Sequence, residues 1–250
     1  RVLFRSQIAS QPKIDEISPA RVPVSVLASA LYVVATPIGN LQDISLRALE
    51  VLRDADLILA EDTRHSARLL RHFGITTPVH AFHGHNEHQA SASMLKRLRA
   101  GEALALITDA GTPLISDPGL PLVSAALAGN CRVIPIPGPC ALIAALCSSG
   151  LGTAKFVFEG FLPPRSSARL QRLRALAQEE RTQVFYEAPH RLLGFIEDLT
   201  ATHGGKRMAA LAKELTKIHE TVCQAPLEDL YRWLREDEQR LKGEFVLVVE

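Results

Sequence analysis

The sequence TDAGTPLISDPG, residues 108–119, directly follows the apolar run Ala103–Ile107 and is the most informative stretch of this chain. Such a run, stopped by a loop, is typical of a buried strand in a parallel sheet. The loop itself holds two glycines, two prolines and two aspartates. Glycine lets the backbone approach a ligand closely, and proline fixes the path of the chain. Open α/β sheets bind small molecules at the carboxyl ends of their strands, so we expect a binding site here, although a plain connection remains an alternative.

Two other stretches show the same pattern of strand, Gly/Pro loop and helix. The apolar residues 31–35 run into the loop TPIGN at residues 36–40, and residues 132–136 run into the loop PGPC at residues 137–140. One loop of this kind is weak evidence for a site. Three such loops at one edge of a parallel sheet predict a cleft that holds a ligand.

Composition bounds the class of protein. The chain has 250 residues, of which 47% are hydrophobic, and this is enough for one large or two medium α/β domains. Its net charge of +1 excludes an overall basic character but leaves a local basic patch possible. The four cysteines lack CxxC spacing, which is typical of a reduced, cytoplasmic protein. No run of about 18 apolar residues occurs, so we expect no membrane span.

The predicted organisation has three segments. Residues 1–30 are expected to form a poorly ordered extension, residues 31–150 an α/β domain, and residues 151–250 a second α/β domain. Strands are expected at residues 31–35, 57–60, 104–107, 132–136, 155–158, 183–186, 208–212 and 245–249. Helices are expected to alternate with them, among others at residues 167–178, 191–200 and 227–235. The predicted fold class is therefore α/β, with two αβα domains and a ligand cleft between them. Because the chain stops directly after an apolar strand, we expect that its last segment is missing.

Charged residues follow several of the predicted strands. Asp62 and Arg64 follow the second strand; a carboxylate there can accept a proton and an arginine can grip a phosphate, but Asp62 can equally cap a helix. The histidines of HGHNEH, residues 83–88, do not have the spacing of a known zinc site, so we expect a polar loop and no metal. The basic segment 165–181 can be a solvated helix face or a phosphate-binding patch.

Eight motifs occur along the chain in a fixed order: TPIGN (36–40), AEDTR (60–64), HNE (85–87), DAGTPLISDPG (109–119), PGPCA (137–141), FYEAPHR (185–191), KELTK (213–217) and KGE (242–244). As a set they closely resemble the bacterial small-subunit ribosomal RNA methyltransferase I family, a branch of the tetrapyrrole methylase superfamily. The resemblance spans residues 31–250. It implies 2′-O-methylation of a cytidine ribose in 16S ribosomal RNA at the decoding centre, with S-adenosyl-L-methionine in the interdomain cleft. It also implies a homodimer that acts on small-subunit ribosomal RNA or on the 30S subunit.

The resemblance further implies which residues surround the cofactor. The superfamily's Gly-Asp-Pro loop corresponds to residues 111–113, where Thr112 replaces the aspartate and Asp109 lies just upstream. The cofactor-binding residues expected in the first domain are Pro37, Gly39, Asp109, Gly111, Thr112, Ile115, Ser116, Cys140 and Ala141. Those expected in the second domain are Tyr186, Leu211, Ala212, Glu244 and Phe245.

The implied chemistry needs alignment more than activation. A sulfonium methyl group is already electrophilic, so the enzyme chiefly has to hold the ribose 2′-oxygen in line with it at about 3 Å. A general base would help, because a protonated hydroxyl is a poor nucleophile. The candidates are Asp62, Glu87 and Glu187, and the sequence leaves open which of them acts. RNA contacts are expected from Arg64, Asn86, Arg165, Arg169, Arg172 and Arg191.

Two other functions have to be weighed against this one. A methyltransferase of the same superfamily can act on a tetrapyrrole or another small molecule, but the motifs AEDTR and FYEAPHR argue against this. A non-catalytic ligand-binding module is disfavoured by the intact Gly/Pro loops at residues 36–40, 109–119 and 137–141.

Overall fold

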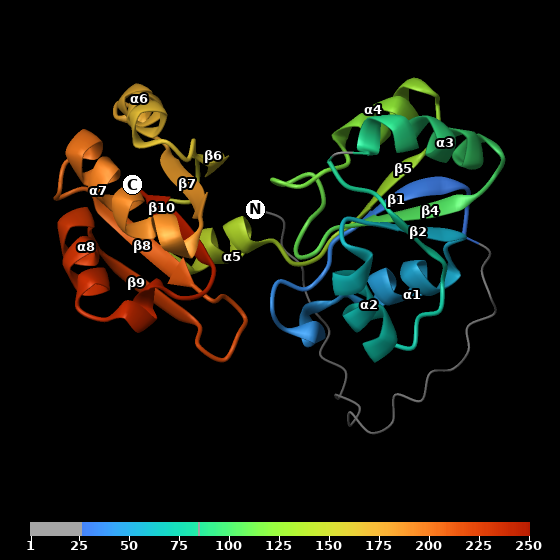
Figure 1. The fold of residues 1–250 in the computed structure, drawn as a ribbon, viewed down its shortest axis with the longest axis horizontal. Helices are drawn as coiled ribbons and strands as arrows, with labels where there is room; N and C mark the ends of the chain where they lie inside the picture. Colours follow the sequence, from blue (N-terminus) through green and yellow to red (C-terminus); the bar gives the residue numbers. More distant parts are fainter. Residues whose placement is uncertain (1–26, 85) are drawn as a thin grey trace, which may run out of the picture.

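The computed structural model describes residues 27–84 and 86–250, and Figure 1 shows them as two bodies joined at a narrow waist. Each body contains one five-stranded sheet. Residues 1–26, which make up most of the expected N-terminal extension, and His85 lie outside the described residues. The predicted class, α/β with two layered domains, is confirmed.

The first sheet is parallel throughout, in the order β3-β2-β4-β1-β5. Its strands are β1 (Ala30–Val34), β2 (Leu57–Ala60), β3 (Val79–Ala81), β4 (Ala103–Ile107) and β5 (Val133–Ile136). Figure 1 shows one pair of helices on each face of this sheet: α1 (Leu46–Asp54) with α2 (Thr63–His72), and α3 (Glu87–Arg99) with α4 (Leu120–Ala128). Leu104 and Leu106 pack towards α3 and α4, whereas Ala103 and Ala105 face α1 and α2. A strand buried on both faces is apolar at every position, which is why β4 has no polar alternation.

The order of the strands brings the three Gly/Pro loops together. Strands β4, β1 and β5 are parallel neighbours, so their carboxyl ends lie at one edge of the sheet. The loops that follow them, beginning at residues 108, 36 and 137, leave the sheet at that edge. The predicted convergence of these loops is confirmed.

The second sheet is mixed, in the order β6-β7-β10-β8-β9. Its strands are β6 (Phe156–Phe161), β7 (Thr182–Glu187), β8 (Met208–Lys213), β9 (Thr221–Pro226) and β10 (Phe245–Val249). Strands β6 and β7 are parallel, and β10 runs antiparallel to both β7 and β8 at the centre. One face carries α6 (Ser166–Leu176), α7 (Leu192–His203) and α8 (Leu227–Arg235). Three short 3-10 helices complete the described elements, at Leu41–Asp43, Pro189–Arg191 and Glu238–Leu241.

The other face of the second sheet is covered by α5 (Ala141–Ser148), which precedes the expected boundary at residue 150. Leu142 and Leu146 of this helix pack against Val184 and Val246 of the sheet. Helix α5 therefore follows a loop of the first body and belongs to the core of the second. It forms the waist seen in Figure 1.

Strands β3 and β9 are absent from the sequence prediction, and both lie at sheet edges. β3 has only three residues and contains the exposed Val79 and His80. β9 is largely exposed on one side of the sheet, so its sequence TVCQAP contains no apolar run. An edge strand buries too little surface to impose a hydrophobic pattern on its sequence.

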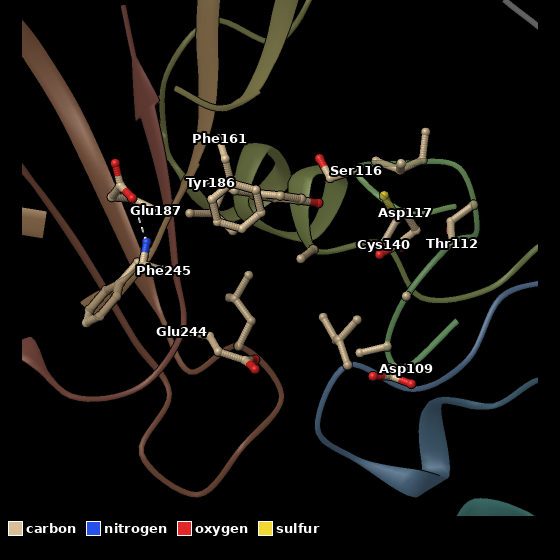
Figure 2. A pocket seen from close by; sticks show the side chains of 18 of the residues that line it. Asp109, Thr112, Ser116, Asp117, Cys140, Phe161, Tyr186, Glu187, Glu244 and Phe245 are labelled. Carbon is tan, nitrogen blue, oxygen red and sulfur yellow. Dashed lines mark hydrogen bonds between the residues drawn. The ribbon is translucent and has the colours of Figure 1, made fainter. Parts of the chain in front are cut away.

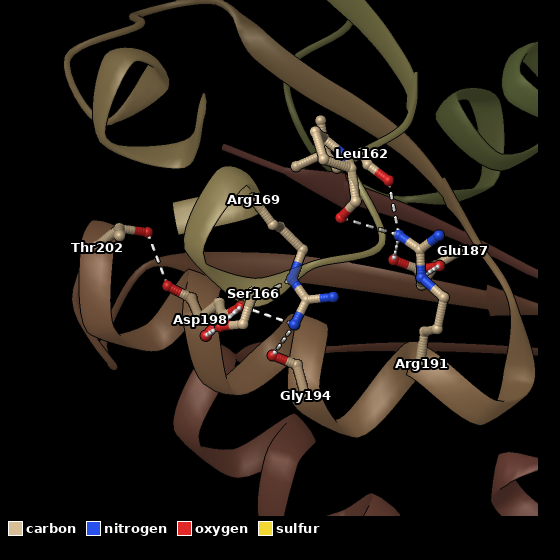
Figure 3. A network of polar contacts seen from close by, with 9 residues as sticks. Leu162, Ser166, Arg169, Glu187, Arg191, Gly194, Asp198 and Thr202 are labelled. Carbon is tan, nitrogen blue, oxygen red and sulfur yellow. Dashed lines mark hydrogen bonds and ion pairs between the residues drawn. The ribbon is translucent and has the colours of Figure 1, made fainter. Parts of the chain in front are cut away.

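Helix α6 is fixed to α7 by a buried ion pair (Figure 3). The guanidinium of Arg169 lies 2.7 Å from the Asp198 carboxylate and donates to the carbonyl oxygen of Gly194 at 3.2 Å. Ser166 donates to the same carboxylate at 3.0 Å. Arg169 is only 5% exposed, so this member of the expected RNA-binding set is not available at the surface. Arg165, the N-cap residue of the same helix, remains exposed.

Replacing Arg169 by alanine should lower the free energy of unfolding by about 3 kcal/mol, because the buried Asp198 then has no cationic partner. Urea denaturation measures this change. The matched control is Arg165→Ala at the N-cap of the same helix, which should change the free energy by less than about 0.5 kcal/mol because the side chain is exposed. Equal effects of the two substitutions would contradict the structural role of Arg169.

Candidate functional site

Hydrogen bonds join the three loops of the first body. The amide of Thr36 donates to the carbonyl oxygen of Gly111 at 2.9 Å, and the amide of Gly111 donates back to Thr36 at 3.0 Å. The hydroxyl of Thr112 donates to the carbonyl oxygen of Pro139 at 2.9 Å and so ties in the third loop. Gly111 has a φ of 86°, a left-handed conformation that favours glycine. These contacts give the three loops one fixed arrangement.

The three loops form one wall of a pocket of about 480 Å³ between the two bodies (Figure 2). This first wall consists of Ile38, residues 109–112, residues 115–117, Cys140 and Ala141 from the loops, together with Glu61 after β2. The opposite wall comes from the second body and consists of Phe161, residues 186–189, Ala212, Leu215 and residues 244–246. Figure 2 shows Asp109, Ser116 and Cys140 facing Tyr186 and Glu244 across this space.

The structure brings most of the expected cofactor residues together in this pocket. The exceptions are Pro37, Gly39 and Leu211. Pro37 and Gly39 line an adjoining cavity. The side chain of Leu211 lies on the other face of β8, in the core formed with α7 and α8. Neighbouring residues of a strand point to opposite faces, so Ala212 faces the pocket and Leu211 does not.

Tyr186 connects the second wall to the waist. Its hydroxyl oxygen accepts a hydrogen bond from the amide of Leu142 at 3.1 Å. Its ring packs edge to face against Phe158 and Phe161, with centroid distances of 4.9 Å and 5.6 Å. Burial, with the nearby Cys140, raises the pKa of Tyr186 to about 12. The phenol therefore stays protonated and keeps a hydrogen to donate into the pocket.

The pocket is acidic. Among the described residues that line it there is no lysine, arginine or histidine, whereas five carboxylates do so: Glu61, Asp109, Asp117, Glu187 and Glu244. Burial and the nearby Asp109 raise the pKa of Glu61. Burial and the nearby Glu61 raise the pKa of Asp117 to about 7. Such a wall favours a ligand that carries positive charge.

The structure places two of the expected catalytic carboxylates outside this pocket. Asp62 is the N-cap of α2, and its carboxylate accepts from the backbone and the side chain of Arg64. These hydrogen bonds lower the pKa of Asp62 to about 2. Glu87, at the start of α3, accepts from the amide of Gly119 at 2.8 Å and so holds the end of the loop 108–119.

Glu187, the third expected carboxylate, lines the pocket but is already engaged. It is 3% exposed and pairs with Arg191 at 3.0 Å. It also accepts from the amide of Ala188 at 2.8 Å. Arg191 in turn donates to the carbonyl oxygen of Leu162 at 2.6 Å (Figure 3). Glu187 and Arg191 therefore brace the second wall.

The remaining residues expected to bind RNA lie in different surroundings. The side chain of Arg64 is 90% exposed. Arg172 pairs with Glu159 at 2.8 Å but remains 49% exposed. Asn86 accepts from the amide of His83 and donates to Ala81, so it shapes the turn before α3. Arg64, Arg165 and Arg172 are thus the members of the expected set that are exposed at the surface, the first and third in ion pairs.

A second cavity of about 370 Å³ adjoins the acidic pocket, and both are lined by Ile38, Asp109, Ala110 and Glu244. It lies between the loop 36–40, helix α2 and the KELTK loop. It contains the basic side chains of His65, Arg68 and Lys217. Lys217 packs over Gly39, where an added Cβ would lie 2.5 Å from the lysine Cγ. Its ammonium pairs with Glu214 and Glu244 at 2.8 Å each, so this loop closes one side of the cavity.

Four residues of these two spaces are not singled out by the sequence alone: Glu61, Asp117, Arg68 and Lys217. Glu61 and Asp117 lie inside quoted motifs, but only the pairing of β2 with β4 brings them together. His65 and Arg68 are three residues apart, so they lie on one face of α2. This spacing predicts that both side chains face the cleft, but only once α2 is known to border it.

The described residues contain no group of three or more histidine, cysteine, aspartate or glutamate side chains placed to hold a metal ion. Within residues 27–84 and 86–250, no helix has both the length and the apolar character that crossing a membrane requires.

Known proteins resemble this chain over most of its length. Residues 30–231 match the family described as Tetrapyrrole (Corrin/Porphyrin) Methylases. The chain is 54% identical over 222 residues to the ribosomal RNA small subunit methyltransferase I of Pseudomonas aeruginosa, covering 89% of this chain and 79% of that protein. It is 53% identical to the protein of the same name from Escherichia coli O157:H7, covering 88% and 77%. A Synechocystis protein of that name is also 53% identical, covering 88% and 78%.

Solved structures share the fold at low sequence identity. A diphthine synthase superposes with a TM-score of 0.66 and 18% identity, covering 88% of this chain and 89% of that one. The uroporphyrin-III C-methyltransferase of Thermus thermophilus, complexed with S-adenyl homocysteine, gives a TM-score of 0.60 and 18% identity, covering 88% and 97%.

Removing the Glu87 carboxylate should loosen the loop 108–119, because the amide of Gly119 then has no acceptor. We expect Glu87→Ala to speed hydrogen exchange at this amide at least about tenfold, which corresponds to about 1.4 kcal/mol of local opening. Glu87→Gln keeps an acceptor oxygen and should retain most of the protection. Identical exchange in both variants and the wild type would show that this bond does not hold the loop.

Proposed function

The chain belongs to the tetrapyrrole methylase family, and from this premise we propose that it methylates ribosomal RNA of the small subunit with S-adenosylmethionine as methyl donor. The finer part of the proposal is the acceptor, which we take to be the 2′-oxygen of a cytidine ribose at the decoding centre. The relatives above 50% identity carry the name of a small-subunit ribosomal RNA methyltransferase. That level of identity extends over nearly the whole described chain.

The acidic pocket fits S-adenosylmethionine in size and charge. A volume of about 480 Å³ lies in the range of sites for small cofactors. The cofactor carries a sulfonium and an ammonium against one carboxylate, and the pocket offers carboxylates without a basic side chain among the described lining residues. Ala141, Ala212 and Gly111 leave room for a flat ring between the walls, and Tyr186 supplies an aromatic edge. When bound, the cofactor supplies a methyl group that is already activated for transfer.

The observation that carries the RNA part of the proposal is the identity above 50% to proteins named small-subunit ribosomal RNA methyltransferases. The cavity beside the acidic pocket offers a place for the RNA backbone, because His65, Arg68 and Lys217 line it together with Asp109 and Glu244. The two spaces share Asp109 and Glu244, so ligands bound in both would lie next to each other. The protein's task is then to align the ribose oxygen with the methyl carbon and to exclude water.

A small-molecule substrate is the second function considered. The porphyrin methyltransferase structures that share the fold are 21% and 18% identical and therefore support the architecture alone. The relatives above 50% identity are named ribosomal RNA methyltransferases, which favours RNA over a tetrapyrrole as the substrate. A non-catalytic module is disfavoured because the relatives above 50% identity are named methyltransferases.

We extend the proposal to the assembly and its place in the cell. It includes a homodimer, a cytoplasmic location, and either bare ribosomal RNA or the 30S subunit as the partner. These parts are supported by the resemblance to the methyltransferase family.

Replacing Gly111 by alanine should weaken the binding of S-adenosylhomocysteine at least about tenfold. The residue has a φ of 86°, and the added Cβ would lie 3.4 Å from Ile38 Cγ2 at the pocket wall. Titration calorimetry measures the affinity. Gly101→Ala is the matched control, because Gly101 has a φ of 101° and open space around its Cβ. It should cost similar stability, about 1–2 kcal/mol, and leave the affinity unchanged.

The function itself is tested by methylation of bare 16S ribosomal RNA and of 30S subunits, with the modified nucleotide mapped afterwards. In the same system, replacing Arg64 and Arg68 together by glutamine should reduce the salt dependence of RNA binding by roughly two units, one for each phosphate that is no longer neutralised. The control is the pair Arg232→Gln and Arg235→Gln on α8, far from the cleft (Figure 1). Methylation of a small molecule but of neither RNA substrate would refute the proposed function.

A further inference from the structure

A row of titratable groups follows the carboxyl ends of three neighbouring strands. His83 follows β3, Glu61 follows β2, and Asp109 and Asp117 follow β4. The charges of His83 and Asp109 affect the pKa of Glu61, and the charges of Glu61 and Asp109 affect the pKa of Asp117. The groups of the row are therefore close enough to influence one another's protonation. At its end, Asp117 borders the acidic pocket (Figure 2).

Three of the other four carboxylates of the pocket are committed to protein partners, and the fourth, Glu61, lies deeper in the row beside Asp109. Glu187 pairs with Arg191 and accepts a backbone amide. Glu244 pairs with Lys217 at 2.8 Å. Asp109 accepts from the amide of Asp62 at 3.1 Å. An oxygen that already accepts from a cation or an amide binds a further proton poorly.

Asp117 has different surroundings. It is half-buried, and the hydroxyl of Thr108 is a polar neighbour that favours its ionised form. The titratable groups that face it are Glu61, Asp109 and the phenol of Tyr186 from the opposite body. None of these groups is a cation, so the two neighbouring carboxylates favour the protonated carboxyl of Asp117.

The loop that carries Asp117 is held in place on both sides. Ser116 has a φ of 68°, a conformation that the surrounding structure has to enforce. Gly119 has a φ of 126°, and a Cβ there would lie 2.7 Å from Leu106 Cδ2, so this close approach needs glycine. Glu87 fixes the amide of Gly119. A carboxylate on a loop held in this way keeps its position relative to the pocket. A group that acts on one substrate atom needs such a fixed position.

We propose that Asp117 is the general base that accepts the proton of the attacking ribose hydroxyl. The O–H bond breaks as the oxygen forms its bond to the methyl carbon, and the proton moves to the Asp117 carboxylate. The methyl carbon–sulfur bond breaks with its electron pair remaining on sulfur, and the carboxyl later releases the proton to water. This assignment rests on the proposed function, because it needs a hydroxyl as the acceptor.

The protonation state of Asp117 depends on whether the methyl donor is bound. With a pKa of about 7, Asp117 is partly protonated at neutral pH in the free protein. A sulfonium placed in the pocket favours the ionised form and lowers this pKa. The carboxylate is then available when the methyl donor is in place.

Nuclear magnetic resonance of carboxyl-labelled protein tests the placement without any turnover. The resonance of Asp117, assigned by its disappearance in Asp117→Asn, should titrate near pH 7 in the free protein. S-adenosylmethionine should lower the pKa by at least about one unit more than S-adenosylhomocysteine, whose sulfur is neutral. Equal pKa values in the two complexes would overturn the assignment, because Asp117 would then lie away from the sulfonium.

Stability provides a second readout. The folded protein holds the Asp117 proton more tightly than the unfolded chain, so the wild type should lose stability as pH rises from about 4 to about 7. Asp117→Asn cannot ionise, so it should remove part of this pH dependence and unfold at a higher temperature than the wild type at pH 8. No difference between the two proteins across this range would contradict a raised pKa.

Kinetics then test the role. Asp117→Asn should lower the single-turnover rate of RNA methylation at least about 100-fold and abolish its rise with pH, while its affinity for S-adenosylhomocysteine stays within about threefold. The control is Asp54→Asn, on an exposed position at the end of α1. An unchanged rate and pH profile in Asp117→Asn would overturn the inference. If the wild type methylates no RNA while the cofactor-dependent pKa difference is present, the proposed function fails and the position of Asp117 stands.

Discussion

The pair of backbone hydrogen bonds between Thr36 and Gly111 is the contact on which the site depends. It joins the ends of β1 and β4 just where the strands give way to loops, and Thr112 extends the connection to Pro139. Because the two bonds between Thr36 and Gly111 use backbone donors and acceptors, most side-chain changes in the loops leave them intact. The exceptions are residue 111, whose left-handed conformation suits glycine, and Thr112, whose hydroxyl makes the bond to Pro139. One wall of the pocket is thus defined by the path of the backbone, and side chains adjust only its chemistry.

The two adjoining spaces differ in their charged groups. The pocket has five carboxylates and no basic side chain among its described lining residues, whereas the cavity beside it adds His65, Arg68 and Lys217 to the shared Asp109 and Glu244. Lys217 lies at the boundary, where it pairs with Glu214 and Glu244. The chain's near-zero net charge therefore coexists with an acidic pocket beside a cavity of mixed charge.

The sequence was sufficient for the parallel sheet, the convergence of three loops and most of the pocket wall, because glycine, proline and continuous apolar runs have direct conformational meaning. It was insufficient where a residue's role depends on a distant partner. Arg169 has the spacing of a surface arginine, and only Asp198 on the next helix explains its burial. Asp62 and Asp117 are both acidic loop residues, but one is bonded to Arg64 and the other faces Glu61. Helix α5 precedes the apparent linker and packs beyond it, since the apolar face of the second sheet requires a cover.

The central position of β10 has a consequence for biosynthesis. This strand comes last among the described elements, yet it lies between β7 and β8 and carries Phe245 into the pocket wall. The first sheet needs only residues up to about 136 and can fold while translation continues. The second sheet lacks its middle strand until residues 245–249 have left the ribosome, and β7 and β8 expose unpaired edges until then. The newly made chain therefore passes through a stage in which the first sheet is folded, while the second sheet is incomplete and prone to aggregate. The cleft can bind a ligand only after β10 has joined the second sheet.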